Sequence, residues 1–287
     1  MTTVQAPPLN SDAAWKLLET MDADATNHDV DHQGARIRWR QWGQGSPLVL
    51  IHGGHGNWMH WIRNIEVLAR QHTVWVPDLP GFGDSGNLTG APHDPSRQQR
   101  LVDALAGSLK QLLGDETLVD LAGFSFGGLV AGQLAAQCRS VRRLALLGTA
   151  GHGGERRQVE ELVNWRLPDR DAMRAALRHN LASFMLHSLE SVDELAMAVH
   201  ETASRSTRFR SKSASRTAAL MEVLESLHQP VLMVWGEHDV TAHPLQAAEQ
   251  LAQDRPEREW VIVPGAGHWV QYERHQEINQ LLVRWFA

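Results

Sequence analysis

The chain of 287 residues has little cysteine, no long apolar run and fewer basic than acidic residues. Its single cysteine, Cys138, cannot form an intramolecular disulfide, and its apolar neighbours favour a buried helix position over a reactive thiol. No CxxC or other paired-ligand spacing indicates zinc. No window approaches the roughly 18 apolar residues of a membrane span, and the start MTTVQAPPLNSD lacks the basic and apolar segments of a signal peptide. We therefore expect a cytoplasmic protein that spans no membrane.

The net charge of -6 disfavours nucleic acid and anionic membranes as general partners, because both carry negative charge themselves. Binding to either would require a local basic patch. We expect a small-molecule substrate and no cofactor or metal. A homodimer is one alternative for the oligomeric state.

Six short apolar runs follow one another from residue 47 onward, each ending at Gly, Pro or Asp: PLVLIHG, HTVWVPD, TLVDLAG, VRRLALLG, PVLMVWG and EWVIVPG. Such runs are typical of parallel strands buried on both faces. Helix-like stretches lie among them, at residues 58–71, 97–113, 126–138, 244–253 and 274–286. The alternation predicts a doubly wound α/β sheet, which binds ligands beyond the carboxyl ends of its strands.

Three regions follow from this pattern. Residues 1–26 form an N-terminal extension with a short helix around residues 13–21, and NHDVDHQGARIRWRQWG after it predicts a β-hairpin. Residues 27–150 and 229–287 form the α/β core. Residues 151–228 contain helix-like stretches such as MRAALRHNLASFML but no convincing strand, which predicts an inserted helical cap.

The stretch LVDLAGFSFGG carries a serine, Ser125, at the point where a strand pattern becomes a helix pattern. A strand that turns into a helix at one residue strains that residue, and Gly123 and Gly127 provide the room that the close packing needs. The geometry would expose the hydroxyl as a nucleophile. The alternative is an ordinary serine at the start of a helix.

A serine nucleophile needs a base and a carboxylate that orients the base. Asp239 follows the run VLMVWG and His268 follows EWVIVPG, so both lie in loops at strand ends. The order serine, acid, histidine is that of an α/β-hydrolase. Glu237 and Glu155 are rival acids, a capping role is the alternative for Asp239, and a solvated loop position is the alternative for His268.

Catalysis also needs N–H donors for a developing oxyanion. We predict the backbone N–H groups of Phe126 and of Gly54, which lies in LVLIHGGHGNW directly after a strand. Gly53 beside it allows the substrate to approach the backbone. The nearby histidines His52, His55 and His60 are interpreted as part of a glycine-rich turn, since no carboxylate or cysteine completes a metal site.

The motifs HGGHG, VPDLPGFGDS, GFSFGG, WGEHD and GHW, in this order, resemble the α/β-hydrolase superfamily over residues 28–287. The resemblance implies the α/β-hydrolase fold with a cap. It also implies that Gly81 and Gly83 shape the floor of the pocket and that Asp78 and Asp84 are structural.

Within the superfamily the chain most resembles hydrolases of meta-cleavage products and related carboxylesterases, because GHWVQYE places Trp269 directly after the histidine. Two departures stand out. Phe124 replaces the asparagine usual before the nucleophile, and Val199 and His200 stand where that group carries a carboxylate-binding arginine. We predict substrate contacts from Gly53, Phe124 and Trp269, in a largely apolar pocket.

The segment RSTRFRSKSASR concentrates positive charge in the cap of an acidic protein. A solvated face is the plain interpretation. The alternatives are recognition of a substrate carboxylate or of an acidic partner such as an acyl carrier protein. The residues concerned are Arg205, Arg208, Arg210, Lys212 and Arg216.

Three functions remain open. The favoured one is a serine hydrolase that cleaves an ester, thioester or lactone of a small to medium, largely apolar substrate through an acyl-enzyme. The second is hydrolysis of a carbon–carbon bond in a 2-hydroxy-6-oxo-dienoate by the same residues. The third is a non-hydrolytic receptor or a cofactor-free oxygenase on the same fold.

Overall fold

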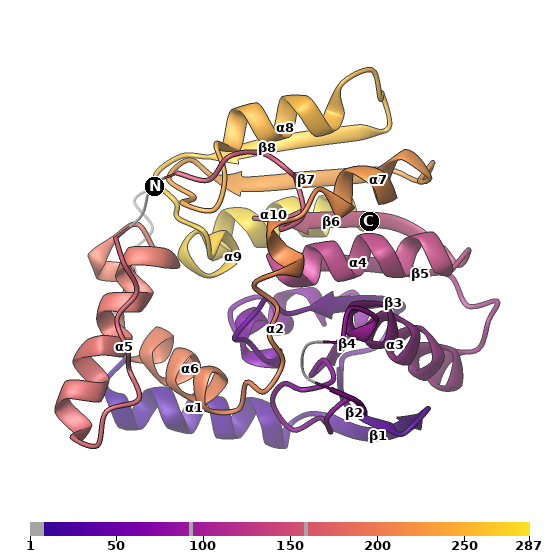
Figure 1. The fold of residues 1–287 in the computed structure, drawn as a ribbon. Coiled ribbons are helices and arrows are strands. Elements are labelled where there is room, and N and C mark those ends of the chain that lie inside the picture. The colour runs from indigo at the N-terminus through magenta and orange to yellow at the C-terminus, as the bar shows by residue number, and fades with distance from the viewer. Residues whose placement is uncertain (1–8, 92–93, 158–159) are drawn as a thin grey trace.

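The structure, a computed structural model, describes residues 9–91, 94–157 and 160–287 (Figure 1). Its sheet of eight strands has the order β1-β2-β4-β3-β5-β6-β7-β8. The strands from β3 to β8 pair in parallel, whereas β1 and β2 form an antiparallel hairpin that joins the sheet through β4. The α/β-hydrolase fold and the hairpin are therefore confirmed. The strands are β1 (Thr26–His32), β2 (Ala35–Trp42), β3 (Ser46–Ile51), β4 (His72–Pro77), β5 (Val119–Phe124), β6 (Val141–Leu147), β7 (Val231–Gly236) and β8 (Arg258–Val263).

The apolar strand runs are explained by burial on both faces of the sheet. Every residue of β5 and β7 is buried. One core lies under α3 (Arg97–Leu113), α4 (Phe126–Gln137), α7 (Ala219–Glu225) and α8 (Pro244–Ala252). The second core lies under α1 (Ser11–Ala23), α2 (Ile65–Leu68), α9 (Val270–Glu273) and α10 (His275–Trp285). Helices cover both faces of the sheet, and the carboxyl ends of its parallel strands lie at one edge.

The insertion after β6 has no strand in its described residues and carries α5 (Arg170–Phe184), η2 (Leu189–Ser191), α6 (Glu194–Arg205) and η3 (Ala214–Arg216). Figure 1 shows α5 and α6 grouped with α1 at one end of the sheet, where α1 packs on α6. Helix α7, at the end of the insertion, packs instead on α4 of the core, where Leu220 and Leu224 are fully buried. No helix in the described part of the chain is both long and apolar enough to cross a bilayer.

Two expected helices have other bounds in the structure, and side-chain hydrogen bonds explain both differences. Residues 58–71 form the short 3₁₀ turn η1 (Trp58–Trp61) and then α2. Asn57 caps η1 by accepting a hydrogen bond from Met59, and the Asn64 amide donates to the carbonyl of Gln271. At the N-terminus, α1 is longer than predicted because Asn10 accepts a hydrogen bond from the N–H of Ala13.

Candidate active site

Ser125 lies between β5 and α4 with φ 54° and ψ -119°, a strained conformation for a residue other than glycine. Its N–H donates to the carbonyl of Leu147 at 2.9 Å, and its carbonyl accepts from Ala150 at 3.0 Å. A Cβ atom at Gly127 would overlap the carbonyl oxygen of His52. The tight packing thus holds the hydroxyl of Ser125 above the end of the sheet.

One chain of hydrogen bonds joins Ser125, His268 and Asp239. The Nε2 atom of His268 lies 2.9 Å from Oγ of Ser125, and its Nδ1 atom lies 2.8 Å from Oδ2 of Asp239. Asp239 follows β7 and His268 follows β8, so the sheet brings residues 143 positions apart together. When Nδ1–H donates to the carboxylate, Nε2 is left free to accept the proton of the serine hydroxyl.

Asp239 is buried and held ionised by its neighbours. Its Oδ1 atom accepts two hydrogen bonds from Thr241, one from the backbone N–H and one from the hydroxyl, each at 2.7 Å. Burial alone would raise the pKa of Asp239, but the attraction to His268 and the hydrogen bonds from His268 and Thr241 outweigh it and lower the pKa. Thr241 was not predicted from the sequence, although a threonine two positions after an aspartate is typical of an Asx turn.

The rival acids lie elsewhere. Glu237 is exposed and accepts a hydrogen bond from the N–H of Gly265 at 2.9 Å, and Glu155 is exposed as well. Asp78 and Asp84 both bind Arg40, with Asp78 at 3.1 Å. Asp239 is therefore the carboxylate that reaches His268.

Two backbone N–H groups beside Ser125 are unused. No described residue accepts a hydrogen bond from the N–H of Phe126 or of Gly54, whereas the N–H of Gly53 donates to Nδ1 of His60 at 3.2 Å. A Cβ atom placed on Gly54 would lie 2.5 Å from Oγ of Ser211 and 3.7 Å from Cβ of Phe126. Ser211, from the cap, was not predicted, because nothing in the sequence places residue 211 beside residue 54.

The residues expected to touch substrate pack against His268 and against the loop after β3. The Phe124 ring packs on the His268 ring at 5.0 Å, and it would lie 3.0 Å from a Cβ atom on Gly53. Trp269 is fully buried, stacks on Tyr272 at 4.2 Å and donates its indole N–H to the carbonyl of His60. Trp269 thus holds the backbone of His60 in place. Its contact with substrate stays a prediction.

Several histidines around the site are kept neutral by burial. His52 donates from Nδ1 to the carbonyl of Gly53 at 2.8 Å and accepts from the N–H of Leu79 at Nε2, which fixes the turn. Burial lowers the pKa of His52, and it lowers that of His60 strongly. Burial and the nearby His55 lower the pKa of His200 to about 4. Within the described ranges no three His, Cys, Asp or Glu side chains are placed to hold a metal ion.

A cavity of about 90 Å³ borders His268 at the junction of cap and core. Phe184 and Leu186 of the cap line one side, and Val240 and Gly267 of the core line the other. The Phe184 ring lies 5.5 Å from the His268 ring. The cap therefore places both apolar and polar side chains next to His268, because Ser183 and His187 also line this cavity.

Comparison with known proteins places the chain among α/β hydrolases. Residues 46–275 match the family described as alpha/beta hydrolase fold. The chain is 29% identical to the dihydrolipoyllysine-residue acetyltransferase component of the acetoin cleaving system of Pseudomonas putida, over 87% of this chain and 66% of that protein. It thus spans about two thirds of that relative's length.

Two further likenesses cover nearly whole proteins. The chain is 29% identical to 2-hydroxymuconate semialdehyde hydrolase of Pseudomonas sp. (strain CF600), over 87% of this chain and 89% of that protein. The structure of an esterase from Rhodococcus sp. ECU1013 superposes with a TM-score of 0.71 at 20% identity, over 91% of this chain and 98% of the esterase. At that identity the likeness shows the shared fold.

Proposed function

The chain belongs to the α/β-hydrolase fold family, and on this premise we propose that it is a serine hydrolase that cleaves esters or thioesters through an acyl-enzyme. The observation that carries the proposal is the continuous chain from Ser125 through His268 to Asp239, with distances of 2.9 and 2.8 Å. This arrangement lies beside the unused N–H groups of Gly54 and Phe126. A nucleophile, a base, an orienting acid and oxyanion donors are the parts that acyl transfer requires.

In the proposed mechanism His268 removes the proton of Ser125 through Nε2, and Oγ attacks the carbonyl carbon of the substrate. The N–H groups of Gly54 and Phe126 stabilise the oxyanion, and Asp239 stabilises the imidazolium. His268 then gives its proton to the leaving alcohol or thiol. Water, deprotonated by His268, attacks the acyl-enzyme and releases the acid.

The surroundings of Ser125 favour an uncharged acyl group of small to medium size. Phe184 and Phe124 face His268, and the nearby histidines His60 and His200 are neutral at pH 7 because burial lowers their pKa. A charged group beside these residues would lose its hydration without gaining a partner.

A second candidate is hydrolysis of a carbon–carbon bond in a 2-hydroxy-6-oxo-dienoate. The relative named 2-hydroxymuconate semialdehyde hydrolase, matched over 89% of its length, favours it. The same three residues would act, with a proton delivered to substrate carbon. Phe124 and His200 set this chain apart, because neither supplies the amide or the fixed positive charge expected in that group.

The deciding experiment compares wild type and Ser125→Ala on p-nitrophenyl esters of increasing acyl length and on a 2-hydroxy-6-oxo-dienoate. Ester cleavage that disappears in Ser125→Ala, with no dienoate turnover, supports the esterase. Fast dienoate cleavage with slow ester cleavage supports the second candidate. Absence of both activities, together with no labelling of Ser125 by a fluorophosphonate, would contradict both and favour a receptor.

A further inference from the structure

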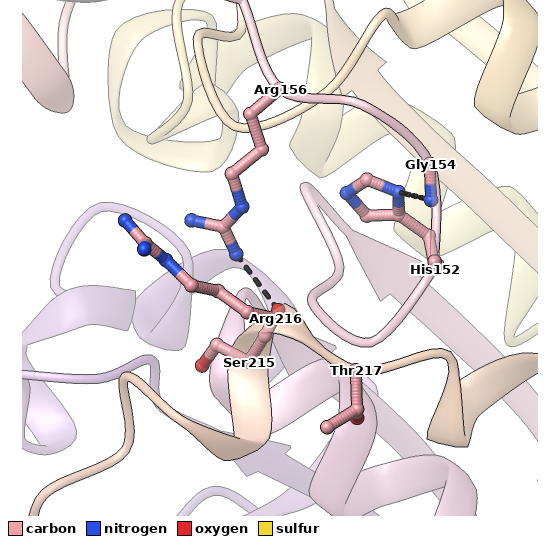
Figure 2. Close-up of a pocket in the computed structure, with 7 residues that line it drawn as sticks. His152, Gly154, Arg156, Ser215, Arg216 and Thr217 are labelled. Carbon is pink, nitrogen blue, oxygen red and sulfur yellow. Dashed lines mark hydrogen bonds between the residues drawn. The ribbon is translucent and has the colours of Figure 1, made fainter.

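A pocket of about 360 Å³ lies outside the site described above, between the loop that follows β6 and the segment around η3 (Figure 2). His152 and Arg156 line it from the loop, and Ser215, Arg216 and Thr217 line it from the other side. Figure 2 shows the guanidinium groups of Arg156 and Arg216 extending into the same space, opposite the ring of His152. The pocket is therefore lined by two cations that are 60 positions apart in the sequence.

Neither arginine has an acidic partner among the described residues. The Arg156 guanidinium donates one hydrogen bond to the carbonyl of Ser215 at 2.8 Å, and the Arg216 guanidinium forms no hydrogen bond to any described residue. Burial, and after it the positive charge of Arg216, lower the pKa of Arg156. Arg156 is half-buried and Arg216 is exposed. The two like charges repel each other, and a bound anion would offset this repulsion.

Other arginines of the cap are engaged within the chain. Arg205 pairs with Glu201 at 3.0 Å, and Arg208 donates to the carbonyl of Ser85 at 2.5 Å and to the amide oxygen of Asn87 at 2.8 Å. The contacts of Arg208 hold the cap against the loop after β4, and the pair of Arg205 lies within α6. Within the basic segment, Arg216 therefore differs from Arg205 and Arg208, because its guanidinium is turned to the pocket.

We propose that this pocket binds the carboxylate or phosphate group of a small molecule. A guanidinium presents its N–H donors in a planar fork that matches two oxygens of such a group. The Arg216 guanidinium offers all of its N–H donors, and the Arg156 guanidinium offers those that Ser215 does not use. The wall opposite them is uncharged, because the Nδ1 atom of His152 accepts from Gly154 and burial lowers the pKa of the ring.

The pocket is connected to the candidate active site through a short path. Nε2 of His152 donates to the carbonyl of Thr241 at 3.1 Å, and Thr241 holds Asp239. Two residues, His152 and Thr241, would thus connect the bound anion to the carboxylate of Asp239, which binds His268. This position allows two sources for the anion: the far end of a substrate, or a separate molecule that changes catalysis.

The test is calorimetric titration of the protein with inorganic phosphate and with succinate at low ionic strength, which needs no turnover and so does not depend on the proposed function. We expect saturable binding of at least one anion to wild type. Arg216→Gln should weaken it roughly tenfold or more, the effect of losing charge-assisted hydrogen bonds. Lys212→Gln, which removes an exposed charge from the same segment, should leave it unchanged.

Arg156→Lys and Arg156→Gln complete the set, with lysine expected to retain more affinity than glutamine. Equal unfolding temperatures of Arg216→Gln and wild type establish that the fold is intact. No binding to wild type, or equal losses in Arg216→Gln and Lys212→Gln, would overturn the proposal, because the attraction would then be absent or diffuse.

Kinetics then separate the two sources. If the anion belongs to the substrate, Arg216→Gln should raise KM for p-nitrophenyl succinate and leave KM for p-nitrophenyl butyrate unchanged. If the anion is a separate molecule, phosphate should change turnover of p-nitrophenyl butyrate by wild type but not by Arg216→Gln. Either pattern supports an anion site formed by Arg156 and Arg216.

Discussion

Thr241 donates two hydrogen bonds to the same carboxylate oxygen of Asp239, one from its backbone N–H and one from its hydroxyl, each 2.7 Å long. The other oxygen of Asp239 is thereby left for His268. The hydroxyl also lies 3.2 Å from Nδ1 of His268, so Thr241 contacts both partners of Ser125. In the proposed mechanism Thr241 would be a positioning residue, because it would orient the acid and the base without reaching Ser125.

Thr241→Val should lower kcat by about tenfold while KM changes little. The substitution keeps the shape of the buried side chain but removes a hydrogen bond to a charged group, worth about 1.5–3 kcal/mol. Steady-state kinetics on a p-nitrophenyl ester measure the effect. Thr241→Ser, which retains the hydroxyl, should stay near wild type, and wild-type turnover by Thr241→Val would show that the backbone N–H suffices.

Gly54→Ala should lower kcat strongly, because its Cβ atom would lie 2.5 Å from Oγ of Ser211 and push the predicted oxyanion donor away. Ser211→Ala removes that oxygen, and the nearest remaining side-chain atom, Cβ of Ser211, lies 3.5 Å away. The double variant should therefore recover part of the lost activity. The double-mutant cycle measures this coupling, and additive effects would mean that the contact does not limit catalysis.

The positions of Ser125, Asp239 and His268 could be predicted from sequence for one reason. Each follows an apolar strand run, and in a parallel sheet the ends of such runs meet at one edge. The same reasoning applies to Gly54 and Phe126. The apolar pattern of the sequence was sufficient, because each of these five residues lies close to the carboxyl end of a strand that this pattern predicts.

Contacts between cap and core could not be predicted in this way. Ser211 and Gly54 are 157 positions apart, and no periodicity reports how the cap returns over the sheet. The predicted helix over residues 58–71 was wrong for a related reason, since the Asn64 amide finds its partners in the last helices of the chain. Tertiary hydrogen bonds of this kind override local helix propensity.

Neutral His200 should make the protein less stable in mild acid. Its pKa is lowered to about 4 by burial, whereas an unfolded histidine titrates near pH 6.5. Between these values the unfolded chain binds more protons than the folded chain, so stability falls as the pH decreases from about 6.5 to about 4. Chemical unfolding at pH 7 and pH 5 should show a smaller loss for His200→Gln than for wild type.

His228→Gln, at an exposed position, is the matched control and should retain the wild-type loss. Burial also lowers the pKa of His52, His60, His72 and His152, so His200→Gln removes one part of the acid sensitivity. Equal losses for His200→Gln and wild type would mean that His200 is protonated in the folded protein.

Arg40→Met should lower the free energy of unfolding by about 3 kcal/mol or more, since removing one partner leaves a buried charge uncompensated. Arg40 and Asp78 are both almost fully buried, and Asp78 also accepts hydrogen bonds from the N–H groups of Trp58 and Asp84. Arg38→Met on the same strand breaks the more exposed pair with Asp29 and should cost less than about 1 kcal/mol. Urea unfolding of both variants provides the comparison. Equal losses of unfolding free energy in Arg40→Met and Arg38→Met would contradict the prediction. They would show that the Asp78 carboxylate is not left buried as an unpaired charge when Arg40 is removed.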